Sequence, residues 1–260
     1  DGGGYPSWQT ACGGEGKDFV HELVPVGGGW VAAGSSATYT THWDDQRAVR
    51  FDAAGEVVWQ TVLGSEDEEY AYTAMEAGGG VILAGRTSNN WGNSKALFTR
   101  LDADGNLDWH RIYGGTGEIY VHVFSVLSAP GGGIFAAGAH YEGSAWDALA
   151  MELDADGSLL WSRAYGGEAW DGAVAACEAD GGWLLAGVVR SFGAGEADVW
   201  LLRIDAAGDV LWQKALGGPA DESAVALAPV PAGGFILSAD TTSYPDDSSR
   251  GAIWLVRLDA

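Results

Sequence analysis

Four acidic residues each lie four positions after a Gly-Gly or Gly-Ser pair, and carboxylates at recurring positions can bind a cation. They are Asp18, Glu69, Asp171 and Glu222. If these side chains converge, each raises the pKa of the others unless a cation neutralises them, and a hard cation with oxygen ligands would do so. The alternative is that each carboxylate accepts hydrogen bonds from the backbone amides of its own loop. The sequence thus suggests that these four acids bind Ca²⁺, and it suggests no other cofactor.

Aromatic and imidazole side chains in the polar segments between apolar runs form a second group of candidates. Exposed rings can stack on sugars or other flat ligands or contact a protein, and the alternative is that they fold back over the structure. In "GGTGEIYVH" (114–122), where the loop is longer, His122 is expected at the position of the acid. The candidate ligand-binding residues are Trp43, Trp91, Trp146, Trp170, Tyr120, Tyr141, His42, His122 and His140.

The sequence identifies no catalytic residues, so these stay unknown at this stage. It contains no nucleophile elbow, Walker loop, HExxH or Cys pair. "DADG" at 102–105 and 154–157 resembles the start of a calcium loop but lacks the later Glu, and a turn is expected there. Asp45, Asp147 and Asp198 each precede a turn Asp by seven residues, and we interpret them as strand caps.

The chain carries 36 acidic and 13 basic residues, with a formal net charge of −23. Such a surface repels phosphate backbones and anionic lipids, so neither nucleic acid binding nor membrane insertion is expected. The sequence holds 41 Gly and 13 Trp but only 7 Pro, a composition typical of many short strands joined by tight turns.

Two sequence themes repeat along the chain and reveal the elements that must position these residues. In each repeat, the second theme comes after the first along the chain, and it consists of a glycine run and then an apolar strand. The first theme reads "RFDAAGEVVWQTVLGS" (50–65), "RLDADGNLDWHRIYGG" (100–115), "ELDADGSLLWSRAYGG" (152–167) and "RIDAAGDVLWQKALGG" (203–218). The second reads "VGGGWVAAG" (26–34), "AGGGVILAG" (77–85), "PGGGIFAAG" (130–138), "DGGWLLAG" (180–187) and "AGGFILSAD" (232–240).

A repeat of about 50 residues with four short antiparallel strands predicts a β-propeller, and five copies predict five blades. The tryptophans that begin the fourth strands are expected as wedges between blades: Trp8, Trp59, Trp109, Trp161 and Trp212. The chain ends on "IWLVRLDA" (253–260) and begins on "DGGGYPSWQTACGG" (1–14), two halves of a fifth copy of the first theme.

We therefore predict an all-β, five-bladed propeller with four antiparallel strands per blade. N-terminal strand D, residues 5–11, would pair with C-terminal strand C and close the ring, because an open ring leaves unpaired edges. The prediction is a single domain over 1–260. Its blades would span about 13–62, 63–112, 113–164, 165–215, and 216–260 together with 1–12.

The unit "DVWLLRIDAAGDVLWQKALGGPADES" (198–223), followed by "GGFILSADTTS" (233–243), resembles the β-propeller repeat of bacterial and archaeal secreted proteins, often called the SBBP repeat. The resemblance covers essentially the whole chain. It implies a propeller and a secreted or cell-surface location, and it implies no catalytic residues because the family has no agreed ones.

Three functions are compatible with this sequence. The main expectation is a non-catalytic module, and thus no enzyme, that binds a glycan, small molecule or protein segment on the face formed by the variable loops; a monomer is expected. The first alternative is a glycoside-active enzyme that uses carboxylates at the mouth of the central channel, which requires two acids roughly 5–9 Å apart. The second alternative is a structural spacer of a surface protein.

Overall fold

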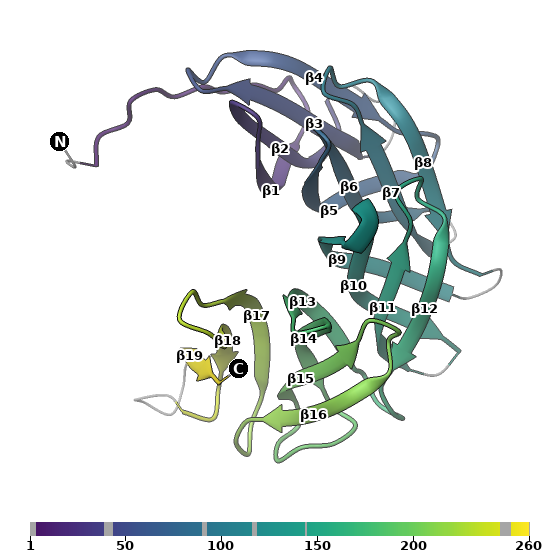
Figure 1. Ribbon diagram of the computed structural model, residues 1–260, viewed down its shortest axis with the longest axis vertical. Coiled ribbons are helices and arrows are strands. Elements are labelled where there is room, and N and C mark those ends of the chain that lie inside the picture. The colour runs from purple at the N-terminus through teal and green to yellow at the C-terminus, as the bar shows by residue number, and fades with distance from the viewer. Residues whose placement is uncertain are drawn as a thin grey trace. The chain divides into compact units, whose positions relative to one another are not determined.

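The structure is a computed structural model that describes residues 4–38, 44–89, 93–115, 119–143, 145–244 and 251–259. The chain consists of two compact units. Unit 1 contains Asp1–Gly92 and Ala96–Ile112, and unit 2 contains Asn93–Lys95 and Tyr113–Ala260. The described residues form β-strands, one short 3₁₀ turn and no α-helix, so the fold is all-β (Figure 1). Within that part of the chain, no helix is long and apolar enough to span a membrane.

Unit 1 consists of two antiparallel meanders, apart from the first two residues of β7 and the last of β8, which belong to unit 2. In each meander, neighbours in sequence are neighbours in the sheet, as the repeat predicts. The first contains β1 (Asp18–Val26), β2 (Gly29–Ser36), β3 (Asp45–Asp52) and β4 (Val57–Leu63). The second contains β5 (Glu68–Ala77), β6 (Gly80–Ser88), β7 (Ser94–Leu101) and β8 (Leu107–Tyr113).

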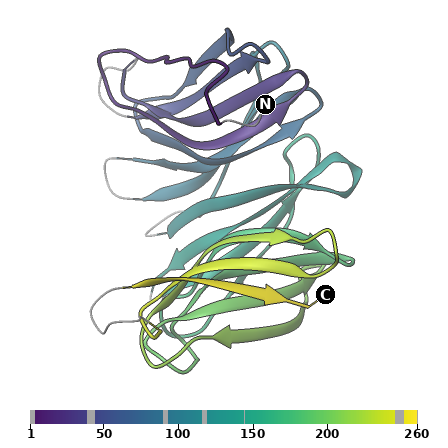
Figure 2. The ribbon, with the colours of Figure 1, turned by 90° about the vertical axis from the view of Figure 1, so that its left-hand side faces the viewer.

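Unit 2 continues the same pattern with three meanders, whose antiparallel strands run side by side in Figure 2. A parallel bridge between Ser94 and Tyr120 joins β7 to β9. The meanders are β9 (Ile119–Ala129), β10 (Gly133–Glu142), β11 (Trp146–Leu153) and β12 (Leu159–Tyr165); β13 (Gly172–Ala179), β14 (Gly182–Val189), β15 (Asp198–Asp205) and β16 (Val210–Leu216); and β17 (Glu222–Pro229), β18 (Phe235–Thr241) and β19 (Ala252–Leu258). The 3₁₀ turn Pro130–Gly132 links β9 to β10.

The turns between third and fourth strands explain why the same residues recur in each copy of the first theme. Asp52 Oδ1 accepts hydrogen bonds from the amides of Ala54 and Glu56, and Gly55 has a φ of +82° that other residues rarely adopt. The same bonds recur at Asp102, Asp154 and Asp205. The DADG segments are therefore turns, as expected.

The second strands of the first four repeats are buried along most of their length, whereas fourth strands are half exposed. Strand β14 is buried at all eight positions, and no position of β16 is fully buried. The core of unit 1 contains Val31, Leu83 and Leu101, and unit 2 has two core clusters. The sequences of these second strands are continuously apolar, because both faces of such a strand are covered.

The tryptophans of the fourth strands cover turns of the next repeat, so their expected role as core wedges holds only in part. The ring of Trp59 lies 2.6 Å from where a Cβ on Gly105 would be, and Trp59 packs partly on the core. Trp161 covers Gly208 in the same way. Trp212 is 40% exposed, because it lies on an outer strand with one face towards solvent.

Residues 5–11 differ from the prediction, because they form no strand, and the sheet of β17, β18 and β19 has three strands instead of four. A strand needs a neighbouring backbone ladder, and the first meander provides none for this segment. The side chains nevertheless make the contacts of a fourth strand. Trp8 covers Gly55, and Thr10 Oγ1 donates to the Gly55 carbonyl at 2.6 Å. Thr61 donates to Gly105 in the same way, at 2.7 Å.

Candidate functional site

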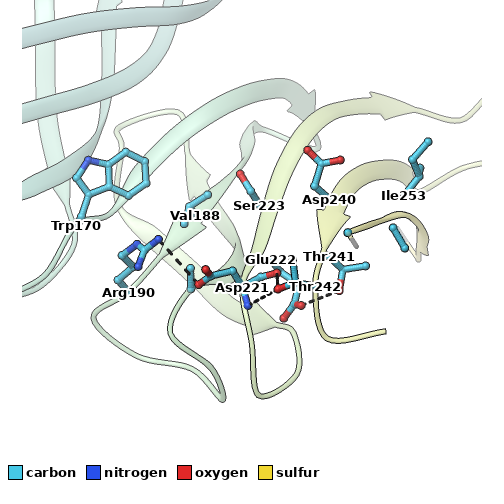
Figure 3. A pocket seen from close by; sticks show the side chains of 13 residues that line it. Trp170, Val188, Arg190, Asp221, Glu222, Ser223, Asp240, Thr241, Thr242 and Ile253 are labelled. Carbon is cyan, nitrogen blue, oxygen red and sulfur yellow. Dashed lines mark hydrogen bonds and ion pairs between the residues drawn. The ribbon is translucent and has the colours of Figure 1, made fainter. Parts of the chain in front are cut away.

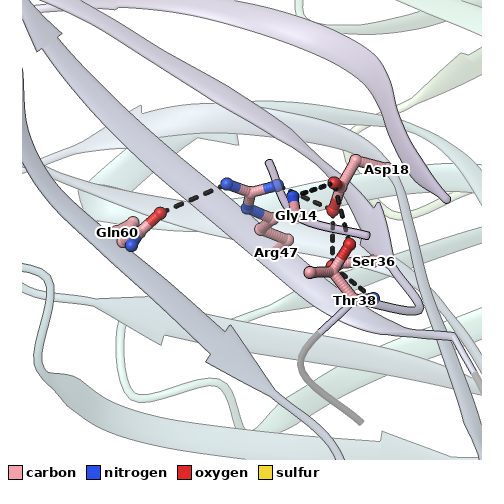
Figure 4. Close-up of polar contacts among 6 residues, drawn as sticks. All are labelled: Gly14, Asp18, Ser36, Thr38, Arg47 and Gln60. Carbon is pink, nitrogen blue, oxygen red and sulfur yellow. Dashed lines mark hydrogen bonds and ion pairs between the residues drawn. The ribbon is translucent and has the colours of Figure 1, made fainter. Parts of the chain in front are cut away.

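The four acids that the sequence suggests as metal ligands are held by donors of their own repeats. Asp18 accepts hydrogen bonds from the Gly14 amide and the hydroxyls of Ser36 and Thr38, and it pairs with Arg47 at 2.7 Å (Figure 4). Burial acts to raise the pKa of Asp18, but these hydrogen bonds and the charge of Arg47 outweigh it and lower the pKa overall.

The other three acids repeat this pattern. Each accepts a hydrogen bond from the amide four residues earlier and from a hydroxyl near the end of the second strand. The pairs of donors are Ser65 and Thr87 for Glu69, Gly167 and Ser191 for Asp171, and Gly218 and Thr241 for Glu222. The hydrogen bonds match the alternative in which each acid binds its own loop. Within the described ranges, no group of three or more His, Cys, Asp or Glu side chains could hold a metal ion.

A second carboxylate lies beside three of these acids. One buried oxygen of Asp45, Asp147 and Asp198 has no hydrogen-bond partner in the described structure. Each of these oxygens faces a glycine so closely that a Cβ there would lie 1.9–2.0 Å away; the glycines are Gly64, Gly166 and Gly217. These contacts explain the first glycine in three of the four Gly-Gly or Gly-Ser pairs.

Burial, followed by the charge and hydrogen bonding of Glu69, raises the pKa of Asp45 to about 6. Burial and the charge of Asp171 also raise the pKa of Asp147. A carboxyl group with a pKa near 6 is suited to proton transfer. However, the paired acids recur at the same place in three repeats, which indicates an architectural role.

The third repeat departs from the acid pattern, as its longer loop predicts, but the expected match of His122 is off by one. Strand register places Val121 at the position of the acid and His122 at the position of Tyr70. His122 Nε2 lies 2.9 Å from Ser94 Oγ. Tyr70 Oη donates to Asp44 at 2.7 Å in the same geometry, so both contacts bridge neighbouring repeats.

Four predicted ligand-binding residues come together in unit 2, where they form an aromatic cluster of half-buried rings. Trp146 is the centre of this cluster: its ring centroid lies 5.1 Å from that of His122, 5.7 Å from Tyr141 and 6.0 Å from Tyr120. The fold places them together because β9, β10 and β11 are hydrogen-bonded neighbours.

The remaining predicted residues do not join this cluster. His140 alternates to the other face of β10, opposite Asp147 in the strand register, and its charge acts to lower the pKa of that acid. His42, Trp43 and Trp91 lie outside the described residues. Trp170 is 40% exposed and lines a separate cavity.

That cavity has a volume of about 540 Å³ and lies entirely within unit 2. Figure 3 shows Trp170 and Arg190 on one side and Asp240 and Ile253 on the other, with Asp221 between them. Its size is typical of a small-molecule site. Strands β14, β17, β18 and β19 supply seven of its thirteen lining residues, and the adjoining loops supply the other six.

Three carboxylates and one guanidinium line the cavity. Glu222 is 1% exposed and accepts its hydrogen bonds from its own repeat, so it serves the fold. Asp221 and Asp240 are exposed, and Arg190 lies 4.0 Å from Asp221. The Asp240 carboxylate accepts no hydrogen bond from any described residue. These two acids are thus available to a ligand.

Sequence reasoning missed Arg190, Asp221 and Asp240 because, among charged residues, it selected only the acids that recur. Asp221 precedes the recurring acid by one residue, where the fourth repeat has Trp170. Asp240 pairs with Ser223 across the sheet, at the second-strand position that holds Arg86 or Val188 elsewhere. The available signal was the non-recurring polar residues next to each recurring acid.

A second group of rings in unit 1 was also missed. Tyr70 and Tyr72 stack with centroids 5.7 Å apart, and Arg86 lies 4.9 Å above Tyr70 while donating to Tyr72 Oη at 2.7 Å. His21 contacts Tyr72 edge to face at 5.7 Å. Arg86 bonds Tyr72 within this group and Tyr70 Oη bonds Asp44, which indicates a structural role.

No known family model matches the chain, and no curated protein matches its sequence. Solved structures share its fold. A protein of Bifidobacterium bifidum s17, described as an exo-β-1,3-galactanase, has a TM-score of 0.53 and 11% identity, with 92% of this chain and 86% of that chain covered. The exo-β-1,3-galactanase 1,3Gal43A from Clostridium thermocellum has a TM-score of 0.54 and 14% identity, covering 96% and 60%. A puromycin hydrolase mutant has a TM-score of 0.53 and 15% identity, covering 84% and 35%.

At these identities the likeness shows the fold, which is all-β and propeller-like. The chain spans 60% and 35% of the length of the last two proteins. The comparison overturns the expectation of a non-catalytic module that is no enzyme, because the matches include two proteins described as galactanases. The sequence ranked the glycoside-active alternative lower, because it contains no catalytic motif.

Proposed function

We propose that the chain is a glycoside-active enzyme and that the cavity of unit 2 is its active site. One observation carries this proposal: two exposed carboxylates, Asp221 and Asp240, line one cavity with the exposed ring of Trp170. The likeness in fold to proteins described as galactanases supports it. The proposed active site is therefore this cavity and not the mouth of the central channel, where the sequence suggested that the acids would act.

Two carboxylates suffice for glycoside hydrolysis. We assign Asp240 as the proton donor, which gives its proton to the glycosidic oxygen as the bond from that oxygen to the anomeric carbon breaks. Asp221 either attacks the anomeric carbon or takes a proton from the attacking water. Arg190, 4.0 Å from Asp221, orients the Asp221 carboxylate for either role.

The test is sugar release from a panel of neutral polysaccharides and aryl glycosides. Asp221→Asn and Asp240→Asn should each lower kcat at least about a hundredfold, the usual contribution of an acid or base. Aryl glycosides with good leaving groups need little proton donation, so Asp240→Asn should retain more activity on them than Asp221→Asn does. Glu178→Gln, an exposed acid on β13 outside the cavity, is the matched control. Absence of hydrolysis, or full activity in both Asn variants, would refute the assignment.

We also propose that the chain forms one five-bladed ring, in which residues 5–11 are the fourth strand of the last blade. Two features support it. Trp8 and Thr10 contact Gly55 as Trp59 and Thr61 contact Gly105. In addition, β19 ends its sheet, and its side chains Ile253 and Leu255 are 81% and 64% exposed, an apolar edge that a fourth strand would cover.

A further inference from the structure

Trp170 packs on a glycine at the start of the fourth meander. A Cβ on Gly172 would lie 3.4 Å from Trp170 Cη2 and 3.6 Å from the Ala139 Cβ. The indole therefore lies over the backbone of Gly172, against the start of the meander, and leaves 40% of its surface exposed.

The strand register shows that Gly172 replaces a larger residue of the other repeats. Gly172 pairs with Val188, as Tyr70 pairs with Arg86. By the same register, the corresponding residues are Phe19, Tyr70, His122 and Ser223. An aromatic side chain at position 172 would occupy the place of the indole. The absence of a side chain thus gives Trp170 its position.

We propose that Trp170 is a stacking platform for the apolar face of a neutral pyranose and that Gly172 is the residue that positions it. This inference rests on the proposed glycoside-active function and names the substrate class of that site. An indole ring provides a large, rigid, apolar surface at low entropic cost, and its exposed face is the surface available to a ligand in the cavity. Asp221 and Asp240 line the same cavity, where they can accept hydrogen bonds from sugar hydroxyls.

The charge of the cavity selects among sugars. Asp221, Asp240 and Glu222 carry three acidic groups against the one guanidinium of Arg190. A uronic acid would bring a further carboxylate among them, and like charges in close contact oppose binding. The site therefore fits neutral pyranosides and disfavours anionic ones.

The first experiment uses calorimetry to measure binding of neutral and uronic oligosaccharides to Asp240→Asn, in which turnover of natural glycosides is expected to be slow. Adding Trp170→Ala should weaken binding of neutral sugars about tenfold, while Trp170→Phe should retain most of it. In the otherwise native chain, Trp170→Ala should raise KM with little change in kcat, as expected for a group that binds and does not transfer protons.

The second experiment tests Gly172. In Gly172→Ala, the new Cβ makes only ordinary van der Waals contacts, so sugar binding should persist. Gly172→Tyr introduces the residue that the second repeat has at this position. Its ring should displace the indole, so this variant should lose sugar binding as Trp170→Ala does. Equal binding by Gly172→Tyr and the parent, or tighter binding of uronic than neutral sugars, would overturn the inference.

The two proposals fail in different ways. Binding that depends on Trp170 without any hydrolysis overturns the enzymatic function and leaves the platform in place. Hydrolysis that is unaffected by Trp170→Ala overturns the platform and leaves the enzyme. If no saccharide binds or is hydrolysed, both are wrong.

Discussion

Replacing Asp45 with Asn should stabilise the protein at neutral pH and make its stability less dependent on pH. In the folded chain, burial and the neighbouring Glu69 and Asp44 raise the pKa of Asp45 from 3.8 to about 6. The folded state thus binds more protons than the unfolded state between about pH 4 and pH 6. Stability falls as the pH rises through this window and stays reduced above it. Asn is isosteric with the protonated acid and carries no charge at any pH.

The size of the effect follows from the pKa difference. About two units at 1.36 kcal/mol each give a ceiling of about 3 kcal/mol, and solvent screening of the partly exposed group reduces this to about 1–2 kcal/mol. For a chain of this length, that corresponds to a rise in Tm of roughly 2–8 °C. The amide of the Asn can also donate to Glu69, which is an acceptor next to it.

Thermal and urea unfolding at pH 4 and pH 8 measure this effect. Asp45→Asn should be more stable than the parent at pH 8 and equally stable near pH 4. Glu66→Gln is the control, because it removes an equal charge from an exposed position in the adjacent loop. The reasoning is refuted if Asp45→Asn is less stable than the parent at pH 8, or if Glu66→Gln gives the same gain.

Two further predictions concern the repeats. Gly64→Ala places a Cβ 1.9 Å from the Asp45 carboxylate, so it should lower the free energy of unfolding by about 1–3 kcal/mol. Gly27→Ala, at a turn glycine with open space around it, should lower it much less. Equal losses of the two variants in urea unfolding would contradict this reasoning. Deleting residues 1–12 should lower Tm markedly, because Trp8 and Thr10 leave the turn at Gly55; a truncated chain that melts cooperatively at the full-length Tm would argue against their role as a fourth strand.

The repeat made most of the local structure predictable. The strands of the second repeat, β5 to β8, follow one another in the sheet as the predicted four-strand unit requires. The turn at Gly55 was predictable because a positive φ requires glycine. The alternative reading of the four acids also matched the hydrogen bonds, because a carboxylate that recurs beside a tight loop has backbone amides close at hand.

The candidate site was only partly predictable, because it depends on residues that do not recur. Trp170, Tyr120 and Trp146 could be selected as aromatic residues outside the repeating themes. Their partners in space could not be selected, since contacts between strands of different repeats follow from the register. The shift of one residue that places Val121 rather than His122 at the acid position was invisible in the sequence for the same reason.

The sequence by itself determined an all-β chain of repeating four-strand units, because side-chain alternation and turn glycines act over a few neighbouring residues. Only the tertiary structure decided which carboxylates are available to a ligand. Asp171 and Asp221 look alike in sequence, yet Asp171 is 0% exposed and bonded to Ser191, while Asp221 is exposed beside Arg190. The difference arises because burial and hydrogen bonding of a carboxylate are set by the strands packed around it, and those strands come from distant parts of the chain.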